Sequence, residues 1–500
     1  MLFSKFIKFN TPRIFFFLIL ILAFLLRIIL IDQYETWSDE KLSVLEANGM
    51  LTFEIPNGNE FTKKNIESNN NLHQVILSTI KGDGGNGILY IVSLHFWTIL
   101  FSNSDFAVRF LSVIMGIIVV FITYSISLQL FANKKLAILS MLLMAIHPQL
   151  ISFSQECRAY SFALSFTLLA TYLLFRMVQN NKFNFPSLLF YMLLVAISFL
   201  SHYSTVYIFG AHFFLLLFIF KIEWSVWKKL MLFSLTPLSI ILIWMINYGF
   251  EGLSIISIRN QNYSELAILD PTNNFYMKTG LYSICAGWAQ NLLIFNGNTI
   301  INYGIRILLL LPLISIPLII IYHGLKNLDA VKVKRIHSLI ILTISSLIYA
   351  TILSLVSGHI ISFQHLYSIF STPYSILILS FSIFMIRSLS KSYLKYSLST
   401  LVFLQFSIML FSTCIIYWGY DTHTKNSNSY TLMANKIEKE NIQNDEKIII
   451  TYRDKETALE VNKYLSKSSY NIIQKIDTNC NTGQVSMFLT KSKSRLILLN

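Results

Sequence analysis

The sequence has few charged residues. Asp, Glu, Lys and Arg together make up 13% of its 500 residues, whereas a soluble protein carries about a quarter. Hydrophobic residues reach 54%, and the mean hydropathy is +0.58. This composition excludes a string of soluble domains for most of the chain. Because long apolar runs recur from Phe15 to Trp418, the sequence predicts an all-α polytopic membrane protein over that range.

Acidic residues are scarcer than basic ones. The chain has 25 acidic and 39 basic residues, which gives a formal net charge of +14. In a soluble chain this excess would indicate nucleic-acid binding. In a membrane protein it is better explained by Lys and Arg gathering on the cytoplasmic side, so no nucleic-acid partner is predicted.

Cysteine is also scarce. The four residues Cys157, Cys285, Cys414 and Cys480 are widely spaced, with no CxxC pair. Neither a zinc site nor a disulfide framework is therefore indicated.

The basic N-terminal segment runs into the apolar stretch Ile14–Ile31 without a small-x-small cleavage site. We interpret this stretch as a first membrane helix with a cytoplasmic N-terminus rather than a signal peptide. About eleven spans are predicted in all, and the basic clusters fall in alternate loops. The predicted location is the inner (plasma) membrane, with the C-terminus outside. The predicted spans are 14–31, 107–131, 136–152, 159–177, 187–203, 205–220, 230–249, 303–322, 338–356, 366–386 and 397–418.

Two shorter apolar stretches, Ile88–Phe101 and Leu281–Phe295, are interrupted by polar residues. Stretches of this length are more often interfacial or re-entrant than spanning. We place both on the outer face, within long outer loops at 32–106 and 250–302. Any chemistry is therefore expected to face outward.

The composition becomes polar after Trp418. We predict a transmembrane domain over 1–420 and a small extracytoplasmic α/β domain over 421–500, with an accessory or docking role. Its expected elements are strands at 446–452, 471–476, 484–490 and 495–499, and a helix at 455–466 with Asp454 as N-cap.

An acidic pair opens the first outer loop. Asp39 and Glu40 follow Trp37 and Ser38, just beyond the first helix. The pair is a candidate for catalysis. Alternatively, it marks a solvated helix terminus, with Asp39 as the N-cap of a helix over Glu40–Asn48.

A second group of polar residues follows the third span. Glu156, Arg158 and Tyr160 would lie at the mouth of the fourth helix, where ionisable groups are costly and often functional. An arginine fork can hold a phosphate, but a structural Arg158–Glu156 or Arg158–Asp39 pair is equally compatible with the sequence. Arg109 also lies at the outer face, where it could bind phosphate or only reach lipid headgroups.

Several histidines lie at predicted outer ends of helices, namely His202, His359 and His365, the last followed by Tyr367. Each alone is more typical of a packed or interfacial residue than of a ligand. A divalent metal ion remains an open alternative, although no spacing demands one. Its candidate ligands are Asp39, Glu40, Asp83 and His202.

The order of these motifs resembles the integral-membrane glycosyltransferases of the GT-C class. The similarity is greatest to family 39, which includes protein O-mannosyltransferases and lipid A aminoarabinose transferases. It covers about residues 14–210, in the segments Trp37–Glu40, Gly87–Trp97, Phe106–Phe110, Gln155–Tyr160 and Ser201–Tyr203. The resemblance implies a polyprenyl-phosphate-linked sugar donor, and a lipid, polysaccharide or protein acceptor. It also implies an inverting hexosyl or pentosyl transfer on the outer face of the membrane.

The resemblance also implies residue roles. Asp39 would be the general base that deprotonates the acceptor, and Arg158 with Arg109 would stabilise the departing phosphate. The chain departs from the family in three places. Many relatives have a Pro or Pro-Pro before a Leu-Tyr pair, where this chain has Asn86-Gly87-Ile88 before Leu89-Tyr90. An acidic metal ligand of some relatives has only Asp83 nearby, and a late Arg-Tyr pair appears as Leu366-Tyr367 after His365.

Two other function classes fit a membrane protein of this kind. A lipid-linked glycan polymerase or ligase usually depends on Arg and His late in the chain, whereas here the charged motifs come early. A flippase or transporter usually places ionisable residues near the bilayer midplane and shows internal repeats. The candidate residues here cluster at one predicted face, which favours glycosyl transfer.

Overall fold

The structure is a computed structural model of the chain. It describes residues 12–33, 35–50, 60–61, 71–269, 278–295, 329–386, 392–417, 447–452, 471–476, 485–490 and 495–499. The chain divides into two compact units. The first comprises Met1–Ile29 and Ser112–Trp418, and the second comprises Leu30–Leu111 and Gly419–Asn500. The predicted division at residue 420 remains a prediction.

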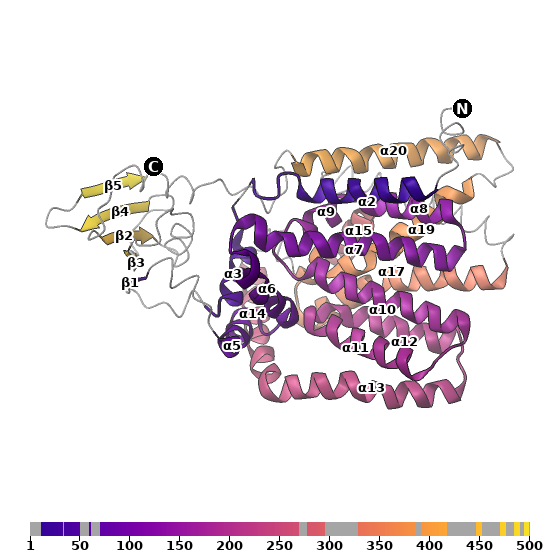
Figure 1. Ribbon diagram of the computed structural model, residues 1–500, viewed down its shortest axis with the longest axis horizontal. Helices are drawn as coiled ribbons and strands as arrows, with labels where there is room; N and C mark the ends of the chain where they lie inside the picture. The colour runs from indigo at the N-terminus through magenta and orange to yellow at the C-terminus, as the bar shows by residue number, and fades with distance from the viewer. Residues whose placement is uncertain are drawn as a thin grey trace. The chain divides into compact units, whose positions relative to one another are not determined.

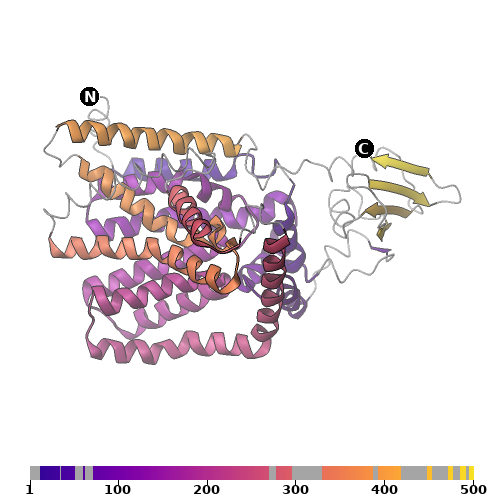
Figure 2. The same ribbon diagram turned by 180° about the vertical axis from the view of Figure 1, so that it is seen from behind.

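The first unit is built from helices. Figures 1 and 2 show α10, α11 and α13 side by side within it. Its helices are α2 (Pro12–Ile28), the greater part of α7 (Asp105–Phe131), α8 (Lys134–Ala145), α9 (Pro148–Ser154), α10 (Tyr160–Asn180), α11 (Phe185–Ser201), α12 (Val206–Phe214), α13 (Trp224–Trp244), α14 (Phe250–Leu269), α15 (Leu281–Phe295), α17 (Ala330–Ser357), α18 (His365–Ser368), α19 (Thr372–Met385) and α20 (Ser392–Tyr417). Short 3₁₀ or π segments lie between several of these helices.

Six helices of the described residues are long and apolar enough to cross a membrane, or seven if the bent α8–α9 pair is one span. The chain is therefore a multi-pass membrane protein. The predicted spans at 14–31, 187–203 and 205–220 form apolar helices that are shorter than the others. The predicted span at 303–322 lies outside the described residues. The count of eleven therefore remains a prediction.

The predicted span at 136–152 is broken in the structure. Helix α8 ends at Ala145, and α9 begins at Pro148 with a bend of 60° between them. Proline has no backbone N–H and restricts the residue before it, so it begins α9 rather than continuing α8. The apolar run alone did not indicate this break.

The region 250–302, predicted as a loop, contains helical structure. A π-helical segment at Met245–Gly249 continues α13 directly into α14, so the helical path extends to Leu269. Helix α15 has the bounds of the short apolar stretch predicted at Leu281–Phe295. Helix α14 within this region was not predicted, because it mixes polar and apolar residues. The place of residues 250–302 on the outer face remains a prediction.

A chain of buried hydrogen bonds links four helices of the first unit. The Thr171 hydroxyl lies 2.6 Å from the Tyr374 hydroxyl and 3.0 Å from His212 Nε2, and His212 Nδ1 lies 3.0 Å from the Tyr191 hydroxyl. These residues come from α10, α19, α12 and α11. Each polar group of the chain has a partner, as burial requires, so the network fixes how the four helices pack.

In the second unit, α3 (Ser38–Ala47) packs on α5 (Leu72–Asp83) and α6 (Ile88–Phe101). Ser78 donates to the Glu46 carbonyl at 2.9 Å, and His95 Nδ1 lies 2.8 Å from the Ala47 carbonyl oxygen. Gly84 and Gly87 hold left-handed backbone conformations, with φ of 65° and 84°, where α5 ends and α6 begins. Helix α6 has the bounds predicted for the first short apolar stretch.

The second unit also contains a five-stranded sheet of order β1-β3-β2-β4-β5. Strands β2 and β3 are parallel, and the other neighbours are antiparallel. A parallel pair requires a crossover connection. The helix predicted at 455–466 lies outside the described residues. The strands are β1 (Glu60–Phe61), β2 (Lys447–Tyr452), β3 (Asn471–Ile476), β4 (Val485–Thr490) and β5 (Arg495–Leu499).

Strands β2 to β5 lie within one residue of the predicted strands. Pairing of β1, from the predicted first outer loop, with β3 was not predicted. The α/β character of the segment 421–500 remains a prediction.

Candidate functional site

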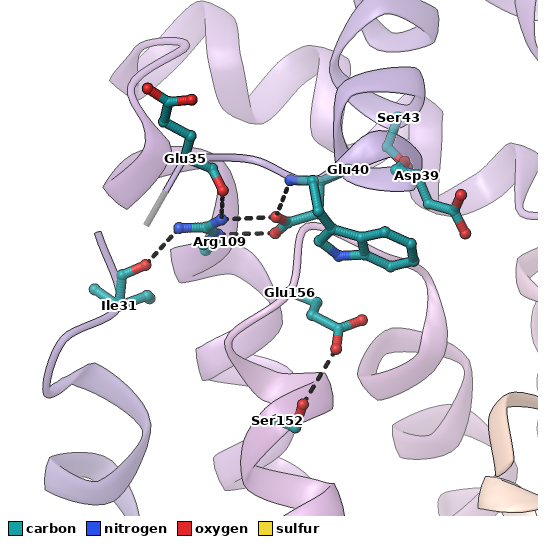
Figure 3. Close-up of polar contacts among 9 residues, drawn as sticks. Ile31, Glu35, Asp39, Glu40, Ser43, Arg109, Ser152 and Glu156 are labelled. Atoms are coloured by element: carbon teal, nitrogen blue, oxygen red, sulfur yellow. Dashed lines mark hydrogen bonds and ion pairs between the residues drawn. The ribbon is translucent and has the colours of Figure 1, made fainter. Parts of the chain in front are cut away.

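A buried ion pair joins Glu40 of α3 to Arg109 of α7. Arg109 Nε donates to Glu40 Oε1 at 2.8 Å, and Arg109 Nη2 donates to Glu40 Oε2 at 2.6 Å. The side chains are 0% and 4% exposed. Figure 3 shows the two parallel contacts. This bidentate geometry fixes both orientation and distance, because the guanidinium fork matches the carboxylate.

Arg109 also binds the chain that precedes α3. Its Nη1 donates to the Ile31 carbonyl at 2.7 Å, and its Nη2 donates to the Glu35 carbonyl at 3.1 Å. The guanidinium therefore ties the residues after the first apolar helix to the start of α3. The structure places Arg109 in this network, and its phosphate-binding role remains a prediction.

The start of α3 differs from the prediction that Asp39 is its N-cap. The helix begins at Ser38, with Trp37 as N-cap. The Trp37 N–H donates to Glu40 Oε2 at 3.1 Å, so one carboxylate both caps the helix and pairs with Arg109. This is half of a capping box. The cap prediction was wrong because the carboxylate three residues after Trp37 takes its N–H.

Asp39 is placed differently from its neighbour. It is half-buried, whereas Glu40 is buried. Figure 3 shows the Asp39 carboxylate pointing away from the Glu40–Arg109 pair. Asp39 lies in the first turn of α3, where the helix dipole favours a negative charge. The acidic pair therefore separates into one carboxylate held by Arg109 and one that faces elsewhere.

The segment that joins α9 to α10 carries the second group of predicted residues. Glu156 is buried, and its Oε1 accepts a hydrogen bond from the Ser152 hydroxyl at 3.2 Å. Arg158 is half-buried, and its backbone carbonyl accepts from the Ser112 hydroxyl at 3.4 Å. The segment is therefore anchored to α9 at one point and to α7 at the other.

Four predicted residues of the first unit gather around aromatic rings. Tyr160 and His202 have ring centroids 5.4 Å apart, and His202 and Tyr367 are 6.5 Å apart. The ring of Phe153 lies 4.7 Å from Tyr160 and 5.7 Å from His365. We call Tyr160, His202, His365 and Tyr367 the aromatic cluster.

His202 is fixed within the aromatic cluster by the backbone. It ends α11, is 4% exposed, and its Nδ1 accepts from the Ser204 N–H at 3.2 Å. Accepting at Nδ1 leaves the neutral ring with its proton on Nε2. The structure thus brings together residues from the ends of α10, α11 and α18, which the sequence presents only as separate candidates.

A metal site is not formed among the residues that the structure describes. In that part of the chain, no three His, Cys, Asp or Glu side chains form a group that could hold an ion. Of the predicted ligands, Asp39, Glu40 and Asp83 lie in the second unit and His202 in the first. Both oxygens of Glu40 accept from Arg109.

Arg27 is a buried polar residue that the sequence reasoning missed. It lies in α2, is 0% exposed, and donates to Ser154 and to three backbone carbonyls. The signal was available, since Arg27 is the only charged residue of the apolar run Ile14–Ile31. A charge within a membrane helix points to a specific partner.

The chain was compared with models of protein families. Residues 87–246 match the family model described as dolichyl-phosphate-mannose-protein mannosyltransferase. This range begins at α6 and includes Arg109, Arg158 and His202. The predicted resemblance to GT-C glycosyltransferases is confirmed. No curated protein was found to match the sequence.

Solved structures give a likeness of fold. The oligosaccharyltransferase of Archaeoglobus fulgidus in the apo form superposes with a TM-score of 0.50 at 12% identity, over 88% of this chain. The alignment covers 60% of the oligosaccharyltransferase, so this chain spans well under its full length. ArnT from Cupriavidus metallidurans bound to undecaprenyl phosphate gives a TM-score of 0.40 at 9% identity, over 90% of this chain and 86% of that one.

Proposed function

We propose that this protein is an integral membrane glycosyltransferase that moves a sugar from a polyprenyl-phosphate donor to an acceptor hydroxyl. The acceptor is a lipid, a polysaccharide or a protein. Transfer occurs on the outer face of the membrane and inverts the anomeric centre. The proposal includes the eleven-span topology with a cytoplasmic N-terminus, and an accessory role for the C-terminal segment.

The observation that carries the proposal is the different environment of the two acidic residues of α3. Glu40 is buried and engaged by Arg109 through two hydrogen bonds. Asp39, in the same helical turn, points away from this pair and is half-buried. A general base must reach the proton that it abstracts and must itself be held in place. Asp39 fits this role because its helix is fixed by Glu40 and Arg109.

The reaction needs a base for the acceptor and a cation for the departing phosphate. Asp39 accepts the proton of the acceptor hydroxyl as its oxygen attacks the anomeric carbon. The bond from that carbon to the phosphate oxygen breaks, and its electron pair leaves with the phosphate. We assign Arg158 to stabilise this developing negative charge. The transition state has oxocarbenium character, as in glycoside hydrolysis.

The lipid nature of the donor is supported by the family that matches residues 87–246, whose name specifies a dolichyl-phosphate-mannose donor. It is also supported by physical location. A prenyl chain stays in the bilayer while its phosphate and sugar lie at the interface, which explains why a transferase would have many apolar helices. The fold shared with an oligosaccharyltransferase agrees with this assignment.

A transfer assay tests the proposal. Purified protein in detergent is given a panel of radiolabelled polyprenyl-phosphate sugars, and loss of sugar from the carrier is followed. Wild type should discharge at least one donor, and Asp39→Asn should be at least about 100-fold slower, the lower end of the effect of a lost general base. Asp32→Asn is the matched control, since Asp32 is an exposed carboxylate seven residues earlier, and it should retain wild-type turnover.

The outcomes separate the function classes. Equal turnover by wild type and Asp39→Asn would retain a transferase and remove Asp39 as its base. If wild type discharges no donor but moves labelled lipid-linked glycans across liposome membranes, the flippase alternative replaces the proposal.

A further inference from the structure

Arg27 is a buried cation inside an apolar helix, and the proposed reaction does not use it. Its Nη1 donates to the Ala23 and Ala145 carbonyls at 3.1 and 3.0 Å. Its Nη2 donates to the Met144 carbonyl at 3.4 Å, and its Nε donates to the Ser154 hydroxyl at 3.2 Å. An arginine at membrane depth costs several kcal/mol, so these donors must be satisfied by specific acceptors.

Two of the acceptors lie where the third predicted span breaks. Met144 and Ala145 lie in the last turn of α8. Because the helix ends there, their carbonyls receive no hydrogen bond from a following turn of the same helix. In an unbroken helix the Met144 carbonyl would accept from residue 148, but Pro148 has no N–H. Arg27 supplies the donor that the proline lacks. Its positive charge also suits the negative end of the α8 dipole.

The other end of the same guanidinium reaches the second half of the broken span. Ser154 is the last residue of α9, and its hydroxyl also donates to the Leu150 carbonyl at 2.5 Å. Arg27 therefore spans both halves, from the end of α8 to the end of α9. Close to it, Gln155 Nε2 donates to the Ile29 carbonyl at 3.0 Å, a second link to the chain after α2.

Gly116 of α7 makes room for this arrangement. A Cβ atom at Gly116 would lie 2.1 Å from the Ser154 hydroxyl oxygen and 3.1 Å from Arg27 Nε. Real Cβ atoms essentially never approach another atom to 2.1 Å, so a larger residue at Gly116 would displace the Ser154 hydroxyl from this contact. Gly116 thus offers an independent way to disturb the same hydrogen bond without changing Arg27.

The clamped segment leads directly to the proposed phosphate site. Ser152 of α9 holds Glu156 by a hydrogen bond of 3.2 Å. Arg158 and Tyr160 follow within the next four residues, and Tyr160 begins α10. The orientation of α9 therefore determines the backbone positions of Glu156, Arg158 and Tyr160.

We propose that Arg27 is a positioning residue, which clamps the broken α8–α9 span and thereby sets the place of Glu156, Arg158 and Tyr160 in the donor-phosphate site. The inference rests on the proposed function for the role of that site. The clamp itself is a property of the fold and can be measured without any substrate.

Cys157 provides a direct readout of the clamp. It is 0% exposed and lies between Glu156 and Arg158. In a background where Cys285, Cys414 and Cys480 are replaced by serine, its rate of alkylation by a small maleimide reports how often the segment opens. Arg27→Met removes the clamp, and Arg27→Lys keeps the charge but not the fork that bridges two helices.

We expect Arg27→Met and Gly116→Ala to raise the alkylation rate of Cys157 at least 10-fold, with Arg27→Lys between them and wild type. The KM for the polyprenyl-phosphate sugar should rise in the same order. Arg176→Met is the matched control, since Arg176 lies exposed on α10, and it should change neither quantity.

Unchanged alkylation in folded Arg27→Met would overturn the clamp. Faster alkylation with an unchanged KM would overturn its link to the phosphate site. If Arg27→Met does not fold, Arg27→Lys and Gly116→Ala decide by the same two measurements. A wild-type protein without transferase activity would remove the proposed function, while the alkylation rates would still test the clamp.

Discussion

At the scale of single residues, the Glu40–Arg109 pair has the features of a buried ion pair whose partners depend on each other. Both side chains are almost fully buried, and each makes further contacts to the backbone before α3. Removing one member leaves a buried charge unpaired, which costs more than removing both. The pair therefore stabilises one arrangement of α3.

This dependence can be measured with a double-mutant cycle. Glu40→Gln and Arg109→Met should each lower the free energy of unfolding by about 3–5 kcal/mol, and the double variant should lose clearly less than the sum. Thermal unfolding of the purified protein in detergent measures the difference. Additive losses would show that the two side chains do not interact in solution.

His359 gives a pH-dependent contribution to stability. It follows α17, is 3% exposed, and its ring packs against Tyr263 with centroids 5.8 Å apart. Burial lowers the pKa of His359, because it disfavours the charged form of the ring in the folded protein. Below a pH of about 6.5, the usual histidine pKa, the unfolded chain binds more protons than the folded one. Stability is therefore present above this pH and is lost as the pH falls below it.

The corresponding test compares wild type with His359→Phe at pH 7.5 and pH 5.5. The midpoint of thermal unfolding should fall more steeply with acidification in wild type than in the variant. An identical pH dependence of the two proteins would mean that His359 does not carry this effect.

At the scale of elements, helix α15 is held against the residues that follow α17. Asn291 donates to the Phe363 carbonyl at 3.0 Å. A Cβ atom at Gly287 would lie 2.4 Å from Cγ of Phe363. Phe363 is buried, so it has little room to move. The absence of a side chain at Gly287 therefore permits this packing.

Two glycine substitutions provide a matched pair. Gly287→Ala should destabilise the protein by about 1–3 kcal/mol, because it overpacks the contact with Phe363. Gly210→Ala on α12 meets nothing within 4 Å, and it should be neutral or stabilising by up to about 1 kcal/mol. Midpoints of thermal unfolding compare the two, and equal effects of both substitutions would be inconsistent with the α15 contact.

Elements were predictable from the sequence wherever a local signal marked them. The bounds of α6 and α15 follow from short apolar runs, and strands β2 to β5 follow from short runs of apolar and β-branched residues within a polar segment. The break at Pro148 and the continuation of α13 into α14 did not follow. An apolar run indicates that a segment can enter the membrane. Where a helix breaks within that run depends on whether its backbone carbonyls find hydrogen-bond donors elsewhere in the chain. At Met144 that donor is Arg27, which lies 117 residues away.

The candidate site shows the same limit. Asp39, Glu40 and Arg109 were each predicted as candidate residues. The ion pair between Glu40 and Arg109 was not predicted. The structural pairs considered for arginine involved Arg158, whereas the observed pair joins Arg109 to Glu40 across 69 residues. The aromatic cluster also forms only in three dimensions, because Tyr160, His202 and Tyr367 come from separate helix ends. The sequence therefore indicated which residues are candidates, but it did not indicate which of them contact one another.

At the scale of the whole molecule, the orientation in the membrane is a testable consequence of the charge distribution. Lys134, Lys135 and Lys182 belong to predicted cytoplasmic loops, whereas Asp32 belongs to the predicted first outer loop. Asp32 and Lys182 are both exposed, so cysteines at these positions would be accessible to a reagent on their own side of the membrane.

We expect a single-cysteine Asp32→Cys variant to react with a membrane-impermeant maleimide in intact cells. A Lys182→Cys variant should react only after the membrane is permeabilised. All native cysteines are replaced by serine in both variants. The reverse pattern would invert the topology and place the acidic pair on the cytoplasmic side.

In the proposed reaction, a carboxylate of α3 drives sugar transfer from a lipid phosphate. The most direct test is the single-turnover rate of sugar loss from the polyprenyl-phosphate donor, measured for wild type and Asp39→Asn at saturating donor. We predict that Asp39→Asn binds the donor as wild type does and transfers its sugar at least about 100-fold more slowly. Equal rates in the two proteins would contradict the claim.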